Sequence, residues 1–408
     1  MDLRSKLELL KNLSNNNSSA NVSPEKSGKV KTEEQIVEEL GGRVIINSDG
    51  NCVLVENCYY SMYLHGGFHL LKAREIDLSK MELFFPGISE LTDISKYLFL
   101  DTETTGLSGG TGTVAFLVGI GYFSGDIFCI KQFFMSDYDE EPSMLRALSE
   151  IFSNYEGLVT FNGKCFDWNL LTTRFSFNRI RMAMDEPVHV DLLFPARRLW
   201  KDRLESCSLS SLEENILCEF RTGDIPGSEI PAAYFKFLED RNTDTIRRIM
   251  EHNRNDILSM VSLLIRISEI VNNPFDKCIW EEELFSLGRI YFRSGEYDKA
   301  HKCLEKCTES GNTILRDKAA RLLAYLYKRE GNYPMAVSYW TDLACRKSIS
   351  SMIELAKFYE HKEKNIKKAL EIVEEALDLL RITESTQTTR FDDLKKRYDR
   401  LKRKERRL

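Results

Sequence analysis

Short apolar runs separated by turn residues fill the middle of the chain, whereas apolar residues at helical spacing fill its last third. Runs rich in Leu, Val, Ile, Phe and Thr predict buried strands, and apolar residues three and four apart predict amphipathic helices. Strands are predicted within 97–106 and at 114–123, 127–134, 158–161 and 188–191, with helices at 142–152 and 245–271. A strand-rich meander followed by strands alternating with helices predicts an α/β fold, a mixed sheet flanked by helices.

The chain before this sheet divides into two segments. Residues 1–38 contain a polar tract at 14–19 and few apolar positions, so we expect a flexible arm that cannot bury enough surface to fold. Thr32-Glu33-Glu34-Gln35 is a capping-box pattern, which predicts that a helix starts near Thr32. Apolar stretches at 44–46 and 52–55 flank an Asp-Gly turn, which predicts a β-hairpin. We expect the small β-containing segment 39–95 to pack on the domain formed by 96–273.

Repeated apolar positions predict a second architecture beyond residue 273. Leu287 and Tyr291 in a first copy correspond to Leu323 and Tyr327 in a second. This pattern matches the tetratricopeptide repeat, and three copies are expected at 278–382, the minimum for a stable all-α solenoid. The repeats are expected to bind a protein partner or the substrate, and the pattern does not choose between these ligands.

A basic helix is predicted at 388–408, where Lys and Arg dominate. One interpretation is a polar cap that keeps the end of the solenoid in solution. The other is a surface that contacts nucleic acid.

Composition narrows the class of protein. The formal net charge is −6, so nucleic-acid binding would require a local basic surface rather than an overall positive charge. No apolar run reaches the ~20 residues that a membrane-spanning helix needs, so we expect a cytoplasmic protein without membrane contact. The ten cysteines are scattered without a Cys-x-x-Cys pair, and we expect them to be reduced and not to bind zinc.

Acidic residues in three segments are candidates for one site. Asp101 and Glu103 lie two positions apart on a predicted strand, so their side chains share a face, and two buried charges this close favour a cation between them. Asp167 begins a helix after the strand 158–161, and His252 and Asp256 lie one turn apart on the long helix. Each segment also has a simpler interpretation. The strand charges could be solvated, Asp167 could interact with the helix dipole, and His252 with Asp256 could form a surface pair. Because sites in such sheets form at strand ends, the three segments can converge there.

These motifs resemble those of the DEDD (DnaQ-like) 3′–5′ exonuclease superfamily, which has a ribonuclease-H-like fold. Asp101-Thr102-Glu103-Thr104-Thr105-Gly106 resembles the first motif, Asn162 with Phe166-Asp167 the second, and His252 with Asp256 the third. The run 98–119 is more similar to bacterial YprB-type proteins, which combine such a domain with tetratricopeptide repeats. This resemblance covers roughly 40–375.

The resemblance implies a chemistry and a set of roles. Asp101, Glu103, Asp167 and Asp256 would hold two divalent cations, Mg²⁺ or Mn²⁺, which prefer oxygen ligands. His252 would orient or deprotonate the attacking water. The remaining motif residues would contact a single-stranded 3′ end, and they are Thr104, Thr105, Gly106, Leu107, Asn162 and Phe166.

One spacing departs from the superfamily pattern. Its members carry Tyr four residues before the last Asp, or His five residues before it, whereas this chain has His252 at the Tyr spacing. This departure bears on the identity of the general base and not on the metal ligands. Independently of it, three functions are in competition. They are a two-metal exonuclease on DNA or RNA, a scaffold that binds nucleic acid with weak or absent catalysis, and a structure-selective endonuclease.

Overall fold

The computed structural model of the chain describes residues 31–106, 112–382 and 388–407. Contacts divide it into two compact units. The first contains the chain up to Ala196 together with Ser206–Ser268, and the second contains Arg197–Glu205 together with Glu269–Leu408. The segment 39–95 thus belongs to the first unit, and a short stretch before residue 206 belongs to the second.

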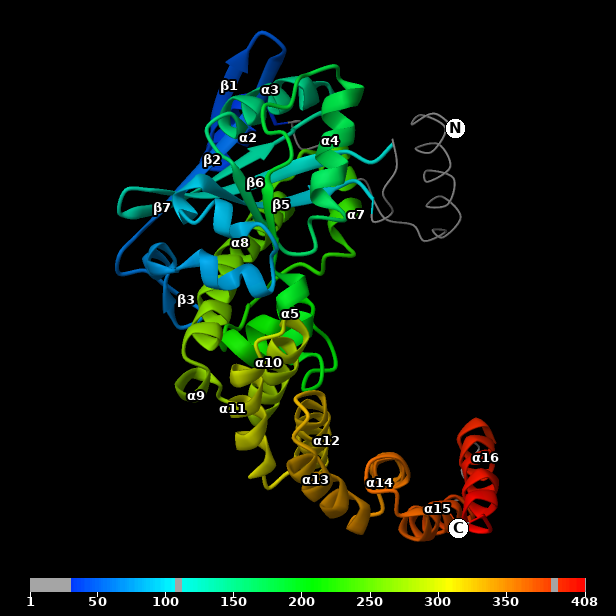
Figure 1. Ribbon diagram of the computed structural model, residues 1–408. Coiled ribbons are helices and arrows are strands. Elements are labelled where there is room, and N and C mark those ends of the chain that lie inside the picture. Colours follow the sequence, from blue (N-terminus) through cyan, green and yellow to red (C-terminus); the bar gives the residue numbers. More distant parts are fainter. Residues whose placement is uncertain (1–30, 107–111, 383–387, 408) are drawn as a thin grey trace, which may run out of the picture. The chain divides into compact units, whose positions relative to one another are not determined.

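In the described residues of the first unit, one mixed sheet of seven strands forms the centre, in the order β1-β2-β7-β6-β5-β8-β9 (Figure 1). The strands are β1 Arg43–Asn47, β2 Gly50–Tyr60, β5 Tyr97–Thr104, β6 Ala115–Ser124, β7 Ile127–Phe134, β8 Gly157–Thr160 and β9 Val188–Asp191. β5 pairs antiparallel with β6 and parallel with β8, and β8 pairs parallel with β9. The hairpin predicted at 44–55 is β1 and β2, which extend the sheet itself. A separate two-stranded sheet joins β3 Leu64–His65 and β4 Phe68–His69.

Helices cover both faces of this sheet, as predicted. Apolar side chains of α3 (Glu141–Phe152) and α4 (Asp167–Phe177) share a core with one face of the strands. A second core joins the other face to α2 (Glu33–Glu39), α7 (Ile230–Asp240) and α8 (Thr243–Asn272). The shorter helices are α5 Leu193–Trp200, α6 Leu209–Leu212 and the π-helix η7 Glu213–Leu217.

The assignment of residues up to 38 to a flexible arm is wrong for its last part. Residues 1–30 lie outside the described residues, but Glu33–Glu39 forms α2, with Ile36 and Val37 buried in the second core. Thr32 accepts a hydrogen bond from the Gln35 backbone, and the Gln35 side chain bonds back to Thr32. This capping box and two adjacent apolar residues are sufficient to fix a short helix at the start of the domain.

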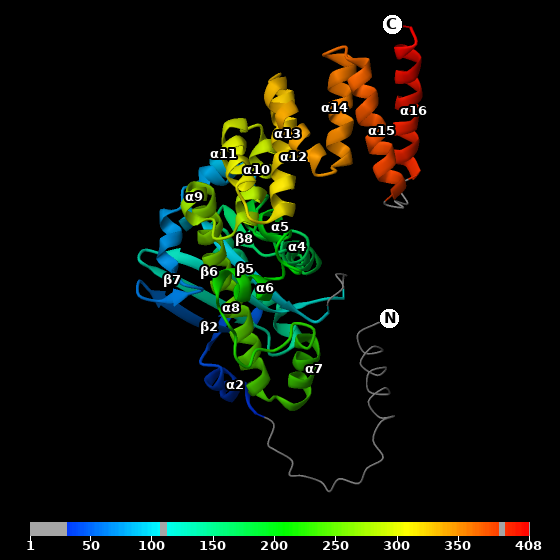
Figure 2. The ribbon, with the colours of Figure 1, turned by 90° about the horizontal axis from the view of Figure 1, so that it is seen from below.

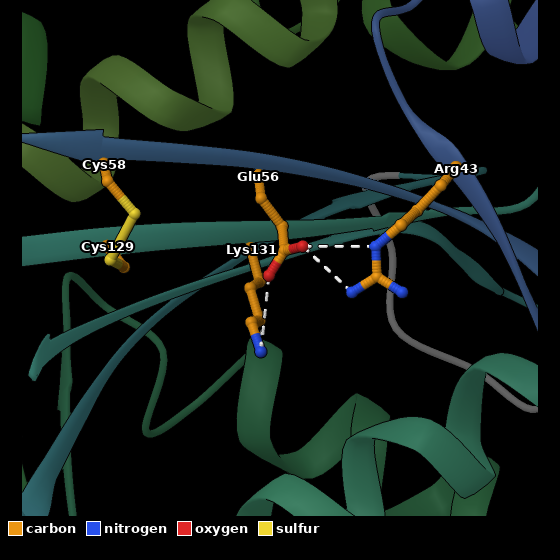
Figure 3. The surroundings of a disulfide bond; sticks show 5 residues. All are labelled: Arg43, Glu56, Cys58, Cys129 and Lys131. Carbon is orange, nitrogen blue, oxygen red and sulfur yellow. Dashed lines mark hydrogen bonds and ion pairs between the residues drawn. A yellow bond between two sulfur atoms is a disulfide. The ribbon is translucent and has the colours of Figure 1, made fainter.

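The expectation that all cysteines are reduced is also wrong. Cys58 on β2 and Cys129 on β7 form a disulfide (Figure 3), while the other eight cysteines form no disulfide. The register places Cys58 directly opposite Cys129 and Glu56 directly opposite Lys131, and Glu56 forms ion pairs with both Lys131 and Arg43. Facing positions on neighbouring antiparallel strands lie close enough for such pairs, but the two cysteines are 71 residues apart in sequence. No local cysteine spacing could have revealed them.

The second unit is built of helices (Figure 2). Three consecutive helix pairs follow a short α9 (Pro274–Lys277), and one further helix, α16, ends the chain. Their bounds are α10 Glu281–Ser294, α11 Tyr297–Thr308, α12 Thr313–Arg329, α13 Tyr333–Cys345, α14 Ile349–His361, α15 Ile366–Ile382 and α16 Thr388–Glu405. In the described part of the chain no helix is long and apolar enough to cross a membrane.

The stretch before residue 206 joins this unit through specific contacts. Trp200 is fully buried and donates a hydrogen bond from Nε1 to Glu283 Oε1 at 2.7 Å. The Arg203 guanidinium lies 3.4 Å from the centre of the Trp280 ring, and Asp202 forms an ion pair of 2.9 Å with Arg289. The chain's contacts therefore do not divide at residue 273, where the sequence analysis placed the domain boundary.

Candidate active site

Asp101 and Glu103 lie at the end of β5, where the strand leaves the buried core. Strand alternation directs them to the same face. Burial raises the pKa of Asp101, and the nearby charges of Asp256 and Asp167 raise it further. Burial likewise raises the pKa of Glu103, with further contributions from Asp101, Asp256 and Asp167. The carboxylates predicted from three segments are thus close enough to oppose one another's ionisation.

Asp167 begins α4, and its carboxylate accepts a hydrogen bond of 2.5 Å from the Thr102 hydroxyl. Thr102 lies between the two acidic residues of β5, so it projects from the opposite face of the strand. Burial raises the pKa of Asp167 to about 6, although the Thr102 bond opposes that shift. In this structure Asp167 is therefore attached to β5 through Thr102, which lies between Asp101 and Glu103 in the sequence.

The loop that carries Asp167 is anchored by a residue the sequence analysis did not select. Asp191, at the end of β9, is almost fully buried and accepts backbone hydrogen bonds from Asn162, Lys164 and Leu193 at 2.8, 3.1 and 3.1 Å. Asn162 has a positive φ of 65°, a left-handed conformation that Asn tolerates better than most residues. Asp191 ends a predicted strand, so its position was evident, but its three donors come from tertiary folding.

Asn253 connects α8 directly to Asp101. Its Nδ2 donates to Asp101 Oδ2 at 2.7 Å, and its Oδ1 accepts from Gln132 Nε2 at 2.8 Å. Asn253 and Gln132 are both fully buried. A Cβ at Gly119 would lie 2.2 Å from Asn253 Oδ1, so only glycine leaves room for this contact. Asn253 is a polar residue on the apolar face of α8, and this feature of the sequence could have identified it.

Arg221 is a second residue that sequence reasoning missed. Its Nη2 donates to Asp256 Oδ1 at 2.5 Å and, at short range, to Glu213, while its Nη1 lies 3.2 Å from Asp224 Oδ2. Glu213 is 1% exposed, so this guanidinium neutralises a buried charge as well as Asp256. Arg221 belongs to a polar loop that sequence analysis could identify only as a loop.

His252 lies between Asp224 and Asp256. Its Nδ1 is 2.9 Å from both carboxylate oxygens of Asp224, and its Nε2 is 3.8 Å from Asp256 Oδ2. A carboxylate on Nδ1 fixes the ring orientation and leaves Nε2 for other partners. The structure thus places His252 beside Asp256, as helical spacing predicted, and adds Asp224 as its partner.

Of the expected substrate residues, Thr104, Thr105 and Gly106 lie at the end of β5. Thr104 Oγ1 donates to the Gly106 carbonyl at 2.9 Å, and Thr105 Oγ1 accepts from the Val114 backbone at 3.0 Å. Phe166 is 54% exposed, so its ring is available to a ligand. Leu107 lies outside the described residues.

The donor set fits hard divalent cations in chemistry, since all four expected ligands are carboxylates. Among the residues that the structure describes, however, no three His, Cys, Asp or Glu side chains are grouped closely enough to hold a metal ion. Two of the four carboxylates are paired with other side chains. Arg221 supplies positive charge to Asp256, and Thr102 holds Asp167.

Comparison with known proteins agrees with this architecture. The RNase H superfamily matches residues 98–268, and the tetratricopeptide repeat matches residues 281–310. The chain is 32% identical over 380 residues to the YprB protein of Bacillus subtilis (strain 168), which covers 90% of this chain and 89% of that protein. This chain belongs to the YprB family. The predicted fold class, a ribonuclease-H-like mixed sheet followed by a helical repeat region, is confirmed.

The two matched regions indicate different roles for the two parts of this YprB-family chain. The RNase H superfamily domain contains the whole acidic cluster and indicates nuclease chemistry. The tetratricopeptide match covers α10 and α11 and indicates an interaction module.

Proposed function

We propose that the chain is a metal-dependent 3′–5′ exonuclease that hydrolyses the phosphodiester bonds of DNA or RNA. The observation that carries this proposal is the acidic cluster itself. Asp101, Glu103, Asp167 and Asp256 come from three elements of an RNase H superfamily domain, and burial together with the neighbouring carboxylate charges raises the pKa values of Asp101 and Glu103. Such repulsion is unfavourable for folding, and buried clusters of carboxylates with raised pKa values are typical of functional sites.

The four carboxylates would hold Mg²⁺ or Mn²⁺, which when bound would stabilise the charge that develops on the attacking and leaving oxygens. Asn253 holds the Asp101 carboxylate in place. Asp224 orients His252, whose Nε2 is placed to orient or accept a proton from water. The exposed Phe166 ring offers a stacking surface for a base near the 3′ end.

The test is degradation of 5′-labelled single-stranded DNA and RNA with Mg²⁺ or Mn²⁺. We expect products that shorten from the 3′ end. Asp101→Asn and Asp256→Asn should each lower the rate by orders of magnitude, since each removes the negative charge of a proposed cation ligand. Asp244→Asn is a matched control, because Asp244 lies on the same helix as Asp256 and is 70% exposed. Full activity in excess chelator, or in both site variants, would contradict the proposal.

A covalently closed circular substrate separates exonuclease from endonuclease action. An exonuclease leaves the circle intact and degrades it only after nicking. Cleavage of the intact circle by the wild-type chain, lost in Asp101→Asn, would instead assign the same site to an endonuclease.

A further inference from the structure

The helical repeats contain a groove that the acidic site does not explain. It has a volume of about 580 Å³ and lies between α10 and α12, with Asp202 at its edge. Its α10 wall consists of Phe285, Arg289, Phe292 and Arg293. These residues are spaced by three, four and seven positions, so they form a single stripe along the helix.

The α12 wall repeats the pattern. Lys318, Arg321 and Tyr325 line it, again at three- and four-residue spacing. Tyr325 is 54% exposed, and its ring meets that of Phe292 edge-on with centres 5.7 Å apart. Cationic and aromatic side chains therefore alternate along two facing helices.

Cationic side chains outnumber acidic ones in the lining of this groove. Asp202 is the acidic side chain in its lining, and it already forms an ion pair with Arg289. Among the described residues, Arg293, Lys318 and Arg321 have no acidic side-chain partner, and all three are exposed. Three cations are thus available to an anionic ligand.

We propose that this groove binds single-stranded nucleic acid, with phosphates on the cations and bases stacked against Tyr325 and Phe292. Positive grooves with accessible aromatic rings bind single strands in this way without sequence preference. An acidic peptide would also meet the cations, but its carboxylate side chains have no flat ring to stack on the exposed Tyr325, whereas every nucleobase has one. The inference deepens the proposed function, since it rests on nucleic acid being the substrate.

Binding is tested by fluorescence anisotropy of the full chain with labelled oligo(dT) and oligo(U) in excess chelator, which separates binding from cleavage. Lys318→Gln/Arg321→Gln should weaken binding about tenfold and reduce the slope of log affinity against log salt by up to ~0.7 for each cation removed. Tyr325→Ala should weaken binding by roughly tenfold without changing that slope, since stacking releases no counterions.

Lys302→Gln/Lys367→Gln is the matched control. It removes the same charge from exposed positions of α11 and α15 outside the groove lining and should leave both quantities unchanged. Equal binding by the groove and control variants would overturn the proposal. So would loss of binding to a labelled Glu-rich peptide, with unchanged oligonucleotide binding, which would assign the groove to a protein partner. Because no cleavage is measured, failure of the proposed nuclease activity would leave this result interpretable.

Discussion

At the scale of single residues, the site depends on neutral polar groups as much as on its carboxylates. Asn253 gives Asp101 a hydrogen-bond donor inside a buried region, and Gln132 fixes the amide so that its NH₂ group faces the carboxylate. The fixed amide determines where one proposed cation ligand points. Removing it should affect both activity and stability.

We expect Asn253→Ala to lower the rate of nucleic-acid hydrolysis and to reduce the free energy of unfolding by about 1–3 kcal/mol, because Gln132 and Asp101 lose a buried partner. Denaturant unfolding in excess chelator measures the second effect without any contribution from bound cation. Asn255→Ala, two positions along the same helix at a half-buried residue, serves as the stability control. If Asn253→Ala matched that control in both measurements, the amide would have no positioning role.

His252 is the residue at which the chain departs from the motif spacing of the DEDD exonucleases that it resembles. We expect His252→Ala to lower the rate by about 10²–10⁴-fold if its ring acts on the attacking water. His252→Tyr separates the two possible actions. A Tyr variant that remains active would show that orienting water is sufficient, whereas a Tyr variant as slow as His252→Ala would show that proton transfer by His is required.

Asp224 extends this test. It lies 2.9 Å from His252 Nδ1, so Asp224→Asn should reduce the rate in the wild-type chain and have little effect in His252→Ala. A wild-type rate and pH profile in His252→Ala would show that His252 has no role in catalysis and is only part of the helix surface.

At the scale of elements, the basic helix α16 packs against the two helices before it. Leu394 and Leu401 are buried in a core with α14 and α15. Arg397, Arg400 and Lys404 all pair with Glu360 of α14, each at 2.8 Å. Glu360 is 2% exposed, so these bonds neutralise a buried charge. The structure therefore favours the cap interpretation of the basic helix for these three cations.

Glu360 gives this contact a pH dependence. Burial alone would raise its pKa, but the hydrogen bonds and charges of Arg400 and Lys404 outweigh burial and lower the pKa to about 2 from 4.5. A folded-state pKa below the unfolded one contributes stability that is complete above about pH 4.5 and is lost as the pH falls toward 2.

Glu360→Gln should consequently increase hydrogen exchange in α16 at neutral pH, and its stability difference from the wild type should shrink between those two pH values. Glu374→Gln is the control, because Glu374 is half-exposed and pairs with Lys402 of the same helix at 3.5 Å. Surface pairs of this kind contribute about 0–1 kcal/mol. A difference between Glu360→Gln and wild type that stayed constant as the pH fell would contradict this account.

The elements themselves were largely predictable, since each depends on a local pattern. β7 and β9 have the bounds that their apolar runs predicted, and α8 extends the predicted 245–271 by only a few residues. Contacts that depend on pairing across the fold leave no local pattern in the sequence. Arg221 meets Asp256 only after a polar loop folds back onto α8, and Cys58 meets Cys129 only in one strand register.

At the scale of the whole molecule, the connection between the two units is not a simple linker. The chain passes into the second unit at Arg197 and returns to the first at Ser206, before leaving again after Ser268. Any truncation that removes the repeats must therefore separate Trp200 from Glu283, which accepts its indole hydrogen bond. The domain boundary predicted at residue 273 lies between these two partners.

We predict that a chain ending at Asn273 is poorly soluble and unfolds at a lower temperature than one ending at Gly311. The shorter chain lacks Glu283, which accepts the Trp200 indole hydrogen bond, and Trp280, on which Arg203 lies. A Trp side chain buries roughly 150–250 Å², so exposing Trp200 creates an apolar patch that favours association. The longer chain keeps α10 and α11 and retains both partners.

Soluble yield and the unfolding temperature of the two truncated chains provide the measurement. Trp200→Gln in the shorter chain should recover part of the solubility, because the substitution removes the largest exposed apolar group. The same substitution should destabilise the longer chain, because it leaves the buried Glu283 without its indole donor. Two truncated chains with equal yield and equal unfolding temperature would show that the nuclease unit folds without the contacts of 197–205. In that case the boundary near residue 273 predicted from the repeats would be the functional one.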